Sequence, residues 1–145
     1  MSERQYPQFP IPGVGAVVFG TKGILLVRRV KEPSRGLWSI PGGGVELGET
    51  QEESVKREVL EETGVSCSVI EFLSTFDIIH RDTNNAVQYH FLLNHYLARA
   101  LTEEIRPEFP EAEVCWFSPD YLPLDEMPPA VAELIAKAQA RINLL

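Results

Sequence analysis

The sequence predicts one mixed domain of helices and strands, of class α/β or α+β, that spans residues 1–145. Residues 50–63 carry the start and stop signals of a helix, and residues 128–145 carry one apolar stripe at helical spacing. Apolar, β-branched segments separated by turn residues predict β-hairpins before and between these two helices. A chain of 145 residues is also long enough to bury a sizeable core.

The expected strands follow from the alternation of apolar segments and turns. A first hairpin is expected around Gly20-Thr21-Lys22-Gly23, and a longer one around the polar turn at residues 80–85. A polar loop and a short strand then precede the C-terminal helix. The expected elements are strands at 13–19, 24–29, 66–80, 87–100 and 111–118, and a turn of helix at 120–124.

The helix at residues 50–63 is bounded by two specific signals. Thr50 followed by Glu53 is a capping box, in which each side chain accepts a bond from the backbone N–H of the other residue. Gly64 suits the left-handed conformation that often follows the end of a helix. A turn rich in glycine leads into this helix and contains Gly42, Gly43, Gly44 and Gly48.

Three glutamates, Glu58, Glu61 and Glu62, share one face of this helix because they are three or four residues apart. Like charges at these spacings destabilise a bare helix, so a compensating charge is expected. Arg57 adjoins the cluster, and Glu49 in the preceding loop is its natural bidentate partner. Hard divalent cations such as Mg²⁺ also bind carboxylates, together with waters and substrate phosphates. From these residues alone, a solvated acidic face and a metal site both remain open.

The stretch from Gly43 to Val65 resembles the Nudix box, Gly-x5-Glu-x7-Arg-Glu-U-x-Glu-Glu-x-Gly-U, in which U is aliphatic. Every specified position is filled, by Gly43, Glu49, Arg57, Glu58, Val59, Glu61, Glu62, Gly64 and Val65. The preceding run Trp38-Ser39-Ile40-Pro41-Gly42-Gly43 and the order of elements also look like Nudix proteins, nearest to the ADP-ribose pyrophosphatase-like subgroup. The resemblance implies an α/β/α sandwich around a mixed β-sheet with its hairpins.

The resemblance also implies a metal-dependent hydrolase that cleaves the pyrophosphate linkage of a nucleoside diphosphate joined to another group. Mg²⁺ or Mn²⁺ would be the cofactor, and ADP-ribose, a related sugar nucleotide or a nucleoside triphosphate would be the substrate. Glu58 and Glu62 are the strongest candidate ligands, with Glu61 binding directly or through water and the Gly43 carbonyl as a further ligand. A nucleotide-binding sensor and a structural metal-binding protein are the alternatives. Loss of box glutamates would favour the sensor, and none is lost.

Other functional roles are less well defined by the motif. By resemblance, Arg57 orients the glutamates through Glu49, and the general base is a box glutamate or an acid from a distant loop. Glu111 and Glu113 are the loop candidates, and a solvated surface role is equally open for both. The candidate phosphate-binding residues are Arg28, Arg29 and Arg81, of which the first two could instead form a solvated strand end.

Composition limits the classes of partner. The net charge of −8 disfavours a grip on long nucleic acid, which needs a basic surface. The chain has no apolar run of membrane-spanning length and no secretory signal pattern. Cys67 and Cys115 fit no metal or redox spacing, which favours reduced core cysteines in a cytoplasmic protein. The expected partner is therefore a small nucleotide derivative, and a homodimer is possible without a predicted interface.

Overall fold

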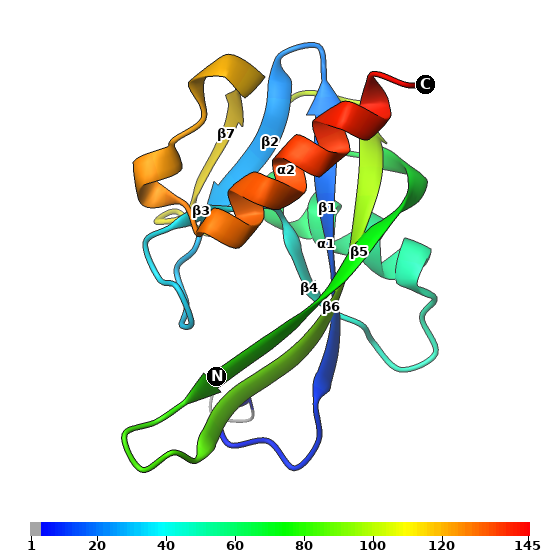
Figure 1. Ribbon diagram of the computed structural model, residues 1–145. Helices are drawn as coiled ribbons and strands as arrows, with labels where there is room; N and C mark the ends of the chain where they lie inside the picture. Colours follow the sequence, from blue (N-terminus) through cyan, green and yellow to red (C-terminus); the bar gives the residue numbers. More distant parts are fainter. Residues whose placement is uncertain (1–3) are drawn as a thin grey trace.

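The computed structural model describes residues 4–145, so the first three residues of the predicted domain lie outside the description. Seven strands form one sheet in the order β3-β2-β1-β6-β5, with β4 paired to β1 and β7 paired to β2 (Figure 1). The strands are β1 (Ile11–Gly20), β2 (Gly23–Arg28), β3 (Trp38–Ser39), β4 (Gly42–Gly44), β5 (Cys67–Arg81), β6 (Val87–Ala100) and β7 (Glu113–Phe117). The α-helices are α1 (Gln51–Thr63) and α2 (Pro129–Ile142). Strands β1 and β6 run parallel while the other pairs are antiparallel, so the sheet is mixed.

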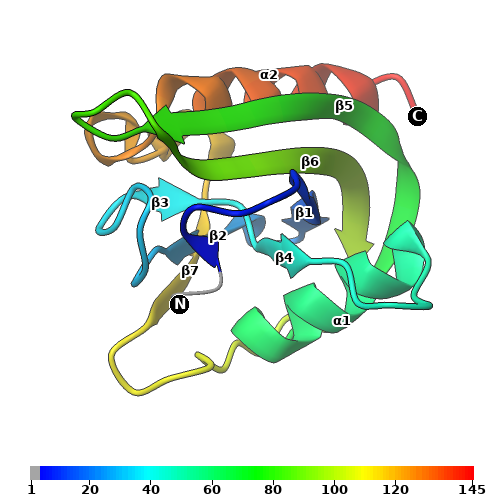
Figure 2. The ribbon, with the colours of Figure 1, turned by 90° about the horizontal axis from the view of Figure 1, so that it is seen from below.

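The two α-helices cover opposite faces of this sheet, as Figure 2 shows. Alternate residues of a strand point to opposite faces, and β1 uses both. Val14, Ala16 and Val18 belong to the core on the α1 side, whereas Val17 and Phe19 belong to the core on the α2 side. The helices contribute Val55 and Val59 to the first core and Leu134, Ile135 and Ala138 to the second. The predicted α/β/α sandwich around a mixed sheet is confirmed.

Helix α1 begins and ends where its two signals predict. Thr50 is the N-cap, and its side chain accepts a bond from the Glu53 N–H while the Glu53 side chain accepts one from the Thr50 N–H. Gly64 follows the helix with φ of 79°, the left-handed conformation that glycine adopts at low cost. The caps therefore set which residues are helical, and the helical spacing then places the three glutamates on one face of α1.

The predicted strands are present, with small differences at their ends. The short strand expected at 111–118 spans Glu113–Phe117, and the expected turn of helix becomes two short 3₁₀ turns, Pro119–Tyr121 and Leu124–Glu126. The sequence did not predict β3 or β4. Strand β4 consists of three glycines, which have low strand propensity, and forms because it pairs with β1. Neither described helix has the length and apolarity needed to cross a membrane.

His95 on β6 makes stability depend on pH. Its side chain is buried, and its Nδ1 has no hydrogen-bond partner among the described residues. Burial disfavours the imidazolium and lowers the pKa of His95 from 6.5 to about 4. The unfolded chain therefore gains a proton at this site before the folded chain does as the pH falls. We expect the free energy of unfolding to fall by up to about 3 kcal/mol between pH 6.5 and pH 4.

Urea titrations at a series of pH values measure this effect. His95→Leu is expected to remove this component of the pH dependence, because leucine does not titrate. The exposed His80, near the tip of the β5–β6 hairpin, supplies the control variant His80→Gln, which should retain it. Equal pH profiles for His95→Leu and the unchanged protein would contradict the assignment.

Candidate active site

The glycine strand β4 lies directly against the acidic face of α1. A side chain at Gly43 would collide with the Glu58 carboxylate, so glycine lets this backbone approach Glu58 without displacing it. The Gly42 N–H donates a hydrogen bond of 3.0 Å to Glu62 Oε1. The structure therefore brings together Gly43, Glu58 and Glu62, which the sequence predicts as metal ligands.

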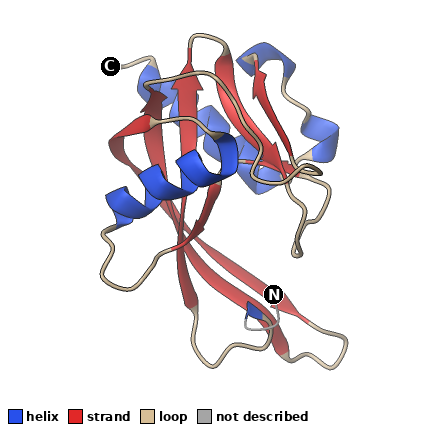
Figure 3. Ribbon diagram, turned by 180° about the vertical axis from the view of Figure 1, so that it is seen from behind, coloured by secondary structure: helices blue, strands red, loops and turns tan. Residues whose placement is uncertain are grey.

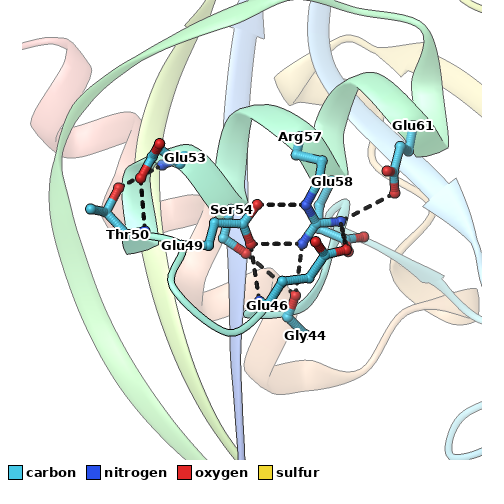
Figure 4. A network of polar contacts seen from close by, with 9 residues as sticks. All are labelled: Gly44, Glu46, Glu49, Thr50, Glu53, Ser54, Arg57, Glu58 and Glu61. Atoms are coloured by element: carbon cyan, nitrogen blue, oxygen red, sulfur yellow. Dashed lines mark hydrogen bonds and ion pairs between the residues drawn. The ribbon is translucent and has the colours of Figure 1, made fainter.

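Arg57 forms the centre of the polar network shown in Figure 4. Its Nε and Nη2 donate to the two carboxylate oxygens of Glu49 at 2.6 and 2.9 Å, a bidentate pair. Its Nη1 donates to Glu58 Oε1 at 2.7 Å and to Glu61 Oε2 at 3.2 Å, and Nη2 also donates to the Gly44 carbonyl at 3.0 Å. The predicted Arg57–Glu49 pair is confirmed, and the same guanidinium holds two of the three glutamates of the acidic face.

The carboxylates of this cluster differ in their electrostatic surroundings. Hydrogen bonds from Arg57 lower the pKa of Glu49 to about 2. Burial raises the pKa of Glu58 above its usual range, although the bond from Arg57 opposes this. Burial, with smaller contributions from the charges of Glu58 and Glu108, raises the pKa of Glu62 to about 8. The charge of Arg29 and the bond from the Gly42 N–H oppose this rise, but burial outweighs them.

The donor atoms of this site suit a hard cation. Glu58 and Glu62 supply carboxylate oxygens and Gly43 supplies a carbonyl, which are the ligands that Mg²⁺ and Mn²⁺ prefer. Within residues 4–145, no three Asp, Glu, His or Cys side chains are arranged to hold an ion by themselves. Mg²⁺ commonly uses only one or two carboxylates and completes its shell with waters and substrate phosphates. The residues therefore fit a metal that binds together with a phosphorylated substrate.

Gly43→Ala tests the close approach of β4 to α1. The added Cβ would overlap the Glu58 carboxylate, which Arg57 holds in place, so either the strand or the glutamate must shift. We expect a loss of about 1–3 kcal/mol in the free energy of unfolding, measured by urea titration. Gly44→Ala is the matched control, because a Cβ at Gly44 would meet no atom within 4 Å. Similar losses for both variants would contradict the proposed contact.

The polar loop between β6 and β7 brings an acid to this site that the sequence did not single out. The Arg106 N–H donates to the Thr63 carbonyl at 2.7 Å, which fixes the loop at the end of α1 (Figure 2). Glu108 follows two residues later, and its charge raises the pKa of both Glu58 and Glu62. No motif marks Glu108, because its position depends on where the loop meets the helix.

The two predicted loop acids lie elsewhere on this side of the molecule. Glu113 begins β7 and forms an ion pair of 3.3 Å with Arg28, which also pairs with Glu126. Glu111 lines a pocket of about 720 Å³ that also contains Phe109. The other residues that line this pocket are Arg28, Arg29, Val30, Lys31 and Arg35. The structure thus places Glu111 and Glu113 beside cationic side chains.

The three predicted phosphate-binding arginines occupy different positions. Arg29 lies close enough to Glu62 for the two charges to interact, and its Nε donates to the Pro33 carbonyl at 2.7 Å. Arg28 is compensated by its two carboxylate partners. Arg81 ends β5 at the tip of the long hairpin, which projects away from α1 (Figure 3), and donates to the Asn85 carbonyl. The structure therefore brings Arg28 and Arg29 to the pocket, and it does not bring Arg81 there.

Part of this chain is similar in sequence to proteins of known families. A putative mutator protein MutT4 of Mycobacterium tuberculosis is 40% identical over 108 residues, which cover 74% of this chain and 41% of that protein. An ADP-ribose pyrophosphatase of Methanocaldococcus jannaschii is 38% identical over 78 residues, which cover 54% of this chain and 46% of that protein. The chain thus spans less than half the length of either curated relative.

Solved structures share the fold described above. The Nudix domain of Shewanella oneidensis NrtR, in complex with ADP ribose, has a TM-score of 0.72 and 26% identity, over 93% of this chain and 90% of that chain. The model of the NUDIX domain family matches residues 10–138, which include both α-helices nearly in full and every strand. With the complete box and the sandwich fold, this match shows that the chain belongs to the Nudix family.

Proposed function

We propose that this protein is a metal-dependent hydrolase that cleaves the pyrophosphate linkage of a nucleoside diphosphate joined to another group. One observation carries the proposal: Glu58 and Glu62 lie against the glycine backbone of β4, and Glu62 is within electrostatic reach of Arg29, which lines a cationic pocket. Carboxylates can hold a divalent cation, and cationic side chains can hold a phosphate. A diphosphate that lies between them would contact both.

Each residue then has a distinct role in the proposed reaction. Glu58 and Glu62 would hold Mg²⁺ or Mn²⁺ with the Gly43 carbonyl, while Glu61 would bind the metal directly or through water. When bound, the metal offsets the charge of the diphosphate and lowers the pKa of a bound water. Arg57 keeps Glu58 in place through its bonds to Glu49 and Glu58. Arg29 would contact a phosphate oxygen, since it lies beside both the pocket and Glu62.

Glu108 is the acid that we propose as general base, because its charge acts on both Glu58 and Glu62. Its carboxylate would accept the proton of the attacking water. Phe109 follows it and lines the pocket with a partly exposed ring, which can stack against a nucleotide base or sugar. Glu111 and Glu113 remain alternative bases, but Glu113 is held by Arg28.

We expect Glu108→Gln to lower kcat by about 10²–10⁴-fold, the usual contribution of a positioned general base. KM should change little, because the amide keeps the shape of the side chain. Glu104→Gln, in the same loop, is the control and should keep normal turnover. If Glu111→Gln or Glu113→Gln shows the large loss and Glu108→Gln does not, the base assignment moves to that residue.

The proposed substrates are small nucleotide derivatives of the ADP-ribose type. Support comes from the Methanocaldococcus jannaschii relative, which is named an ADP-ribose pyrophosphatase, and from the Shewanella oneidensis Nudix domain that binds ADP ribose.

The two free cysteines support a reducing, cytoplasmic location. A homodimer and the exclusion of long nucleic acid also remain predictions.

A substrate panel tests the proposal directly. ADP-ribose, other nucleoside diphosphate sugars and nucleoside triphosphates are incubated with and without Mg²⁺ or Mn²⁺, and the nucleotide products are separated by chromatography. We expect metal-dependent release of AMP from ADP-ribose. Binding of ADP-ribose without turnover under any metal would instead favour the nucleotide-binding sensor.

A further inference from the structure

A second hollow adjoins the cationic pocket and is lined in part by the N-terminal segment. It has a volume of about 150 Å³ and is lined by Arg4, Gln5, Lys31, Glu32, Arg35 and Tyr89. A single water needs only about 10–15 Å³ of such space, so the hollow has room for a polyatomic anion. Lys31 and Arg35 line both cavities, so the two lie next to each other along the loop that carries these residues.

The charges in this hollow favour an anion. Arg4, Lys31 and Arg35 contribute three positive charges, and Glu32 contributes one negative charge. None of the three cationic side chains forms an ion pair with another residue in the described range 4–145. This excess of positive over negative side chains in one hollow is unusual in a chain with a net charge of −8. Cations that are close together and uncompensated bind phosphate groups readily.

Arg4 is held in place by its neighbours. Its guanidinium lies over the ring of Phe91 on β6, 4.9 Å from the centroid. The next residues are bound to the β5–β6 hairpin: Tyr6 N–H donates to the Gln88 carbonyl at 2.8 Å, and Tyr6 OH donates to Asp82 Oδ2 at 2.7 Å. The N-terminal segment therefore forms a fixed wall of the hollow.

The hollow is also connected to the proposed reaction site through Arg29. Burial lowers the pKa of Arg29, the charge of Arg4 lowers it further and the charge of Glu62 raises it, so Arg29 lies within electrostatic reach of both residues. A substrate with its diphosphate beside Glu62 and Arg29 can therefore extend past the loop at Lys31 and Arg35 towards Arg4.

We propose that Arg4, Lys31 and Arg35 form a subsite for a second anionic group, a phosphate ester on the part of the substrate farthest from the metal. This inference rests on the proposed function for its placement relative to the diphosphate. The preferred substrate would be a nucleoside diphosphate sugar that carries one more phosphate on its sugar. The extra phosphate would be recognised and retained, and the bond cleaved would still be the diphosphate linkage.

Equilibrium binding tests the subsite without relying on turnover. Dissociation constants for ADP-ribose and ADP-ribose 1″-phosphate are measured by calorimetry in EDTA at low salt. We expect the phosphorylated compound to bind at least about tenfold more tightly, as one charge-assisted contact allows. Arg4→Gln should reduce this ratio to less than about threefold, because it removes one positive charge from the hollow. Lys22→Gln, the same change in the β1–β2 turn, should leave the ratio intact.

Equal affinities for the two compounds, no measurable binding of either, or an unchanged ratio in Arg4→Gln would each overturn the subsite. The proposed function is tested separately by adding Mg²⁺ and measuring AMP release. If the binding preference holds and neither compound is hydrolysed, the subsite stands and the hydrolase proposal fails. If both are hydrolysed and bind equally, the hydrolase stands and the subsite fails.

Discussion

Glu62→Gln is expected to lower kcat/KM by about 10²–10³-fold or more while the fold stays intact. The substitution removes a negative charge from the proposed metal site and keeps the shape of the side chain. The Gly42 N–H that now donates to Glu62 Oε1 can donate to the amide oxygen instead. Steady-state kinetics with ADP-ribose at saturating Mg²⁺ measures the loss.

The stability of this variant separates a functional role from a structural one. Glu62 is half-buried and its pKa is raised to about 8, so neutralising it is not expected to lower the melting temperature at neutral pH. Glu52→Gln, an exposed position in the first turn of α1, is the matched control and should keep normal turnover. Near-normal activity of Glu62→Gln in Mg²⁺ would count against Glu62 as a ligand.

Arg57→Lys is expected to reduce both activity and stability. Lysine cannot reproduce the planar fork that contacts Glu49 through two nitrogens and also contacts Glu58 and Gly44. Glu58, whose side chain is only 15% exposed, would lose the hydrogen bond from the guanidinium, because one ammonium cannot serve Glu49 and Glu58 in the same geometry. We expect a loss of about 1–3 kcal/mol in the free energy of unfolding and about 10–100-fold in kcat/KM.

A second bidentate arginine supplies the control for this prediction. Arg141 on α2 contacts both carboxylate oxygens of Glu71 at 2.9 and 3.1 Å, and it is largely exposed. Arg141→Lys should cost less than about 1 kcal/mol, since exposed ion pairs contribute little, and should leave turnover unchanged. If Arg57→Lys behaves like Arg141→Lys, the network around Arg57 does not organise the site.

Much of the fold and the acidic face could be predicted because the signals are local. The capping box at Thr50 and Glu53 and the left-handed Gly64 set the limits of α1. Once those limits are known, helical spacing places Glu58, Glu61 and Glu62 on one side. The pairing of Arg57 with Glu49 is also local, because only eight positions and the first turns of α1 separate the two residues.

The remaining features depend on contacts between distant segments, which no local pattern records. Glu108 acts on the acidic face only because Arg106 fixes its loop at the end of α1. Arg4 faces Lys31 only because the N-terminal segment is bound to β6. Strand β4 likewise forms through pairing with β1, against the propensity of its three glycines.

The most direct test is a crystal structure with Mn²⁺ and an ADP-ribose analogue in which a methylene group replaces the bridging oxygen of the diphosphate. The proposed site predicts an anomalous peak at about 2.1 Å from oxygens of Glu58 or Glu62, with the analogue's phosphates completing the coordination. A bound analogue with no manganese beside these two carboxylates would contradict the account.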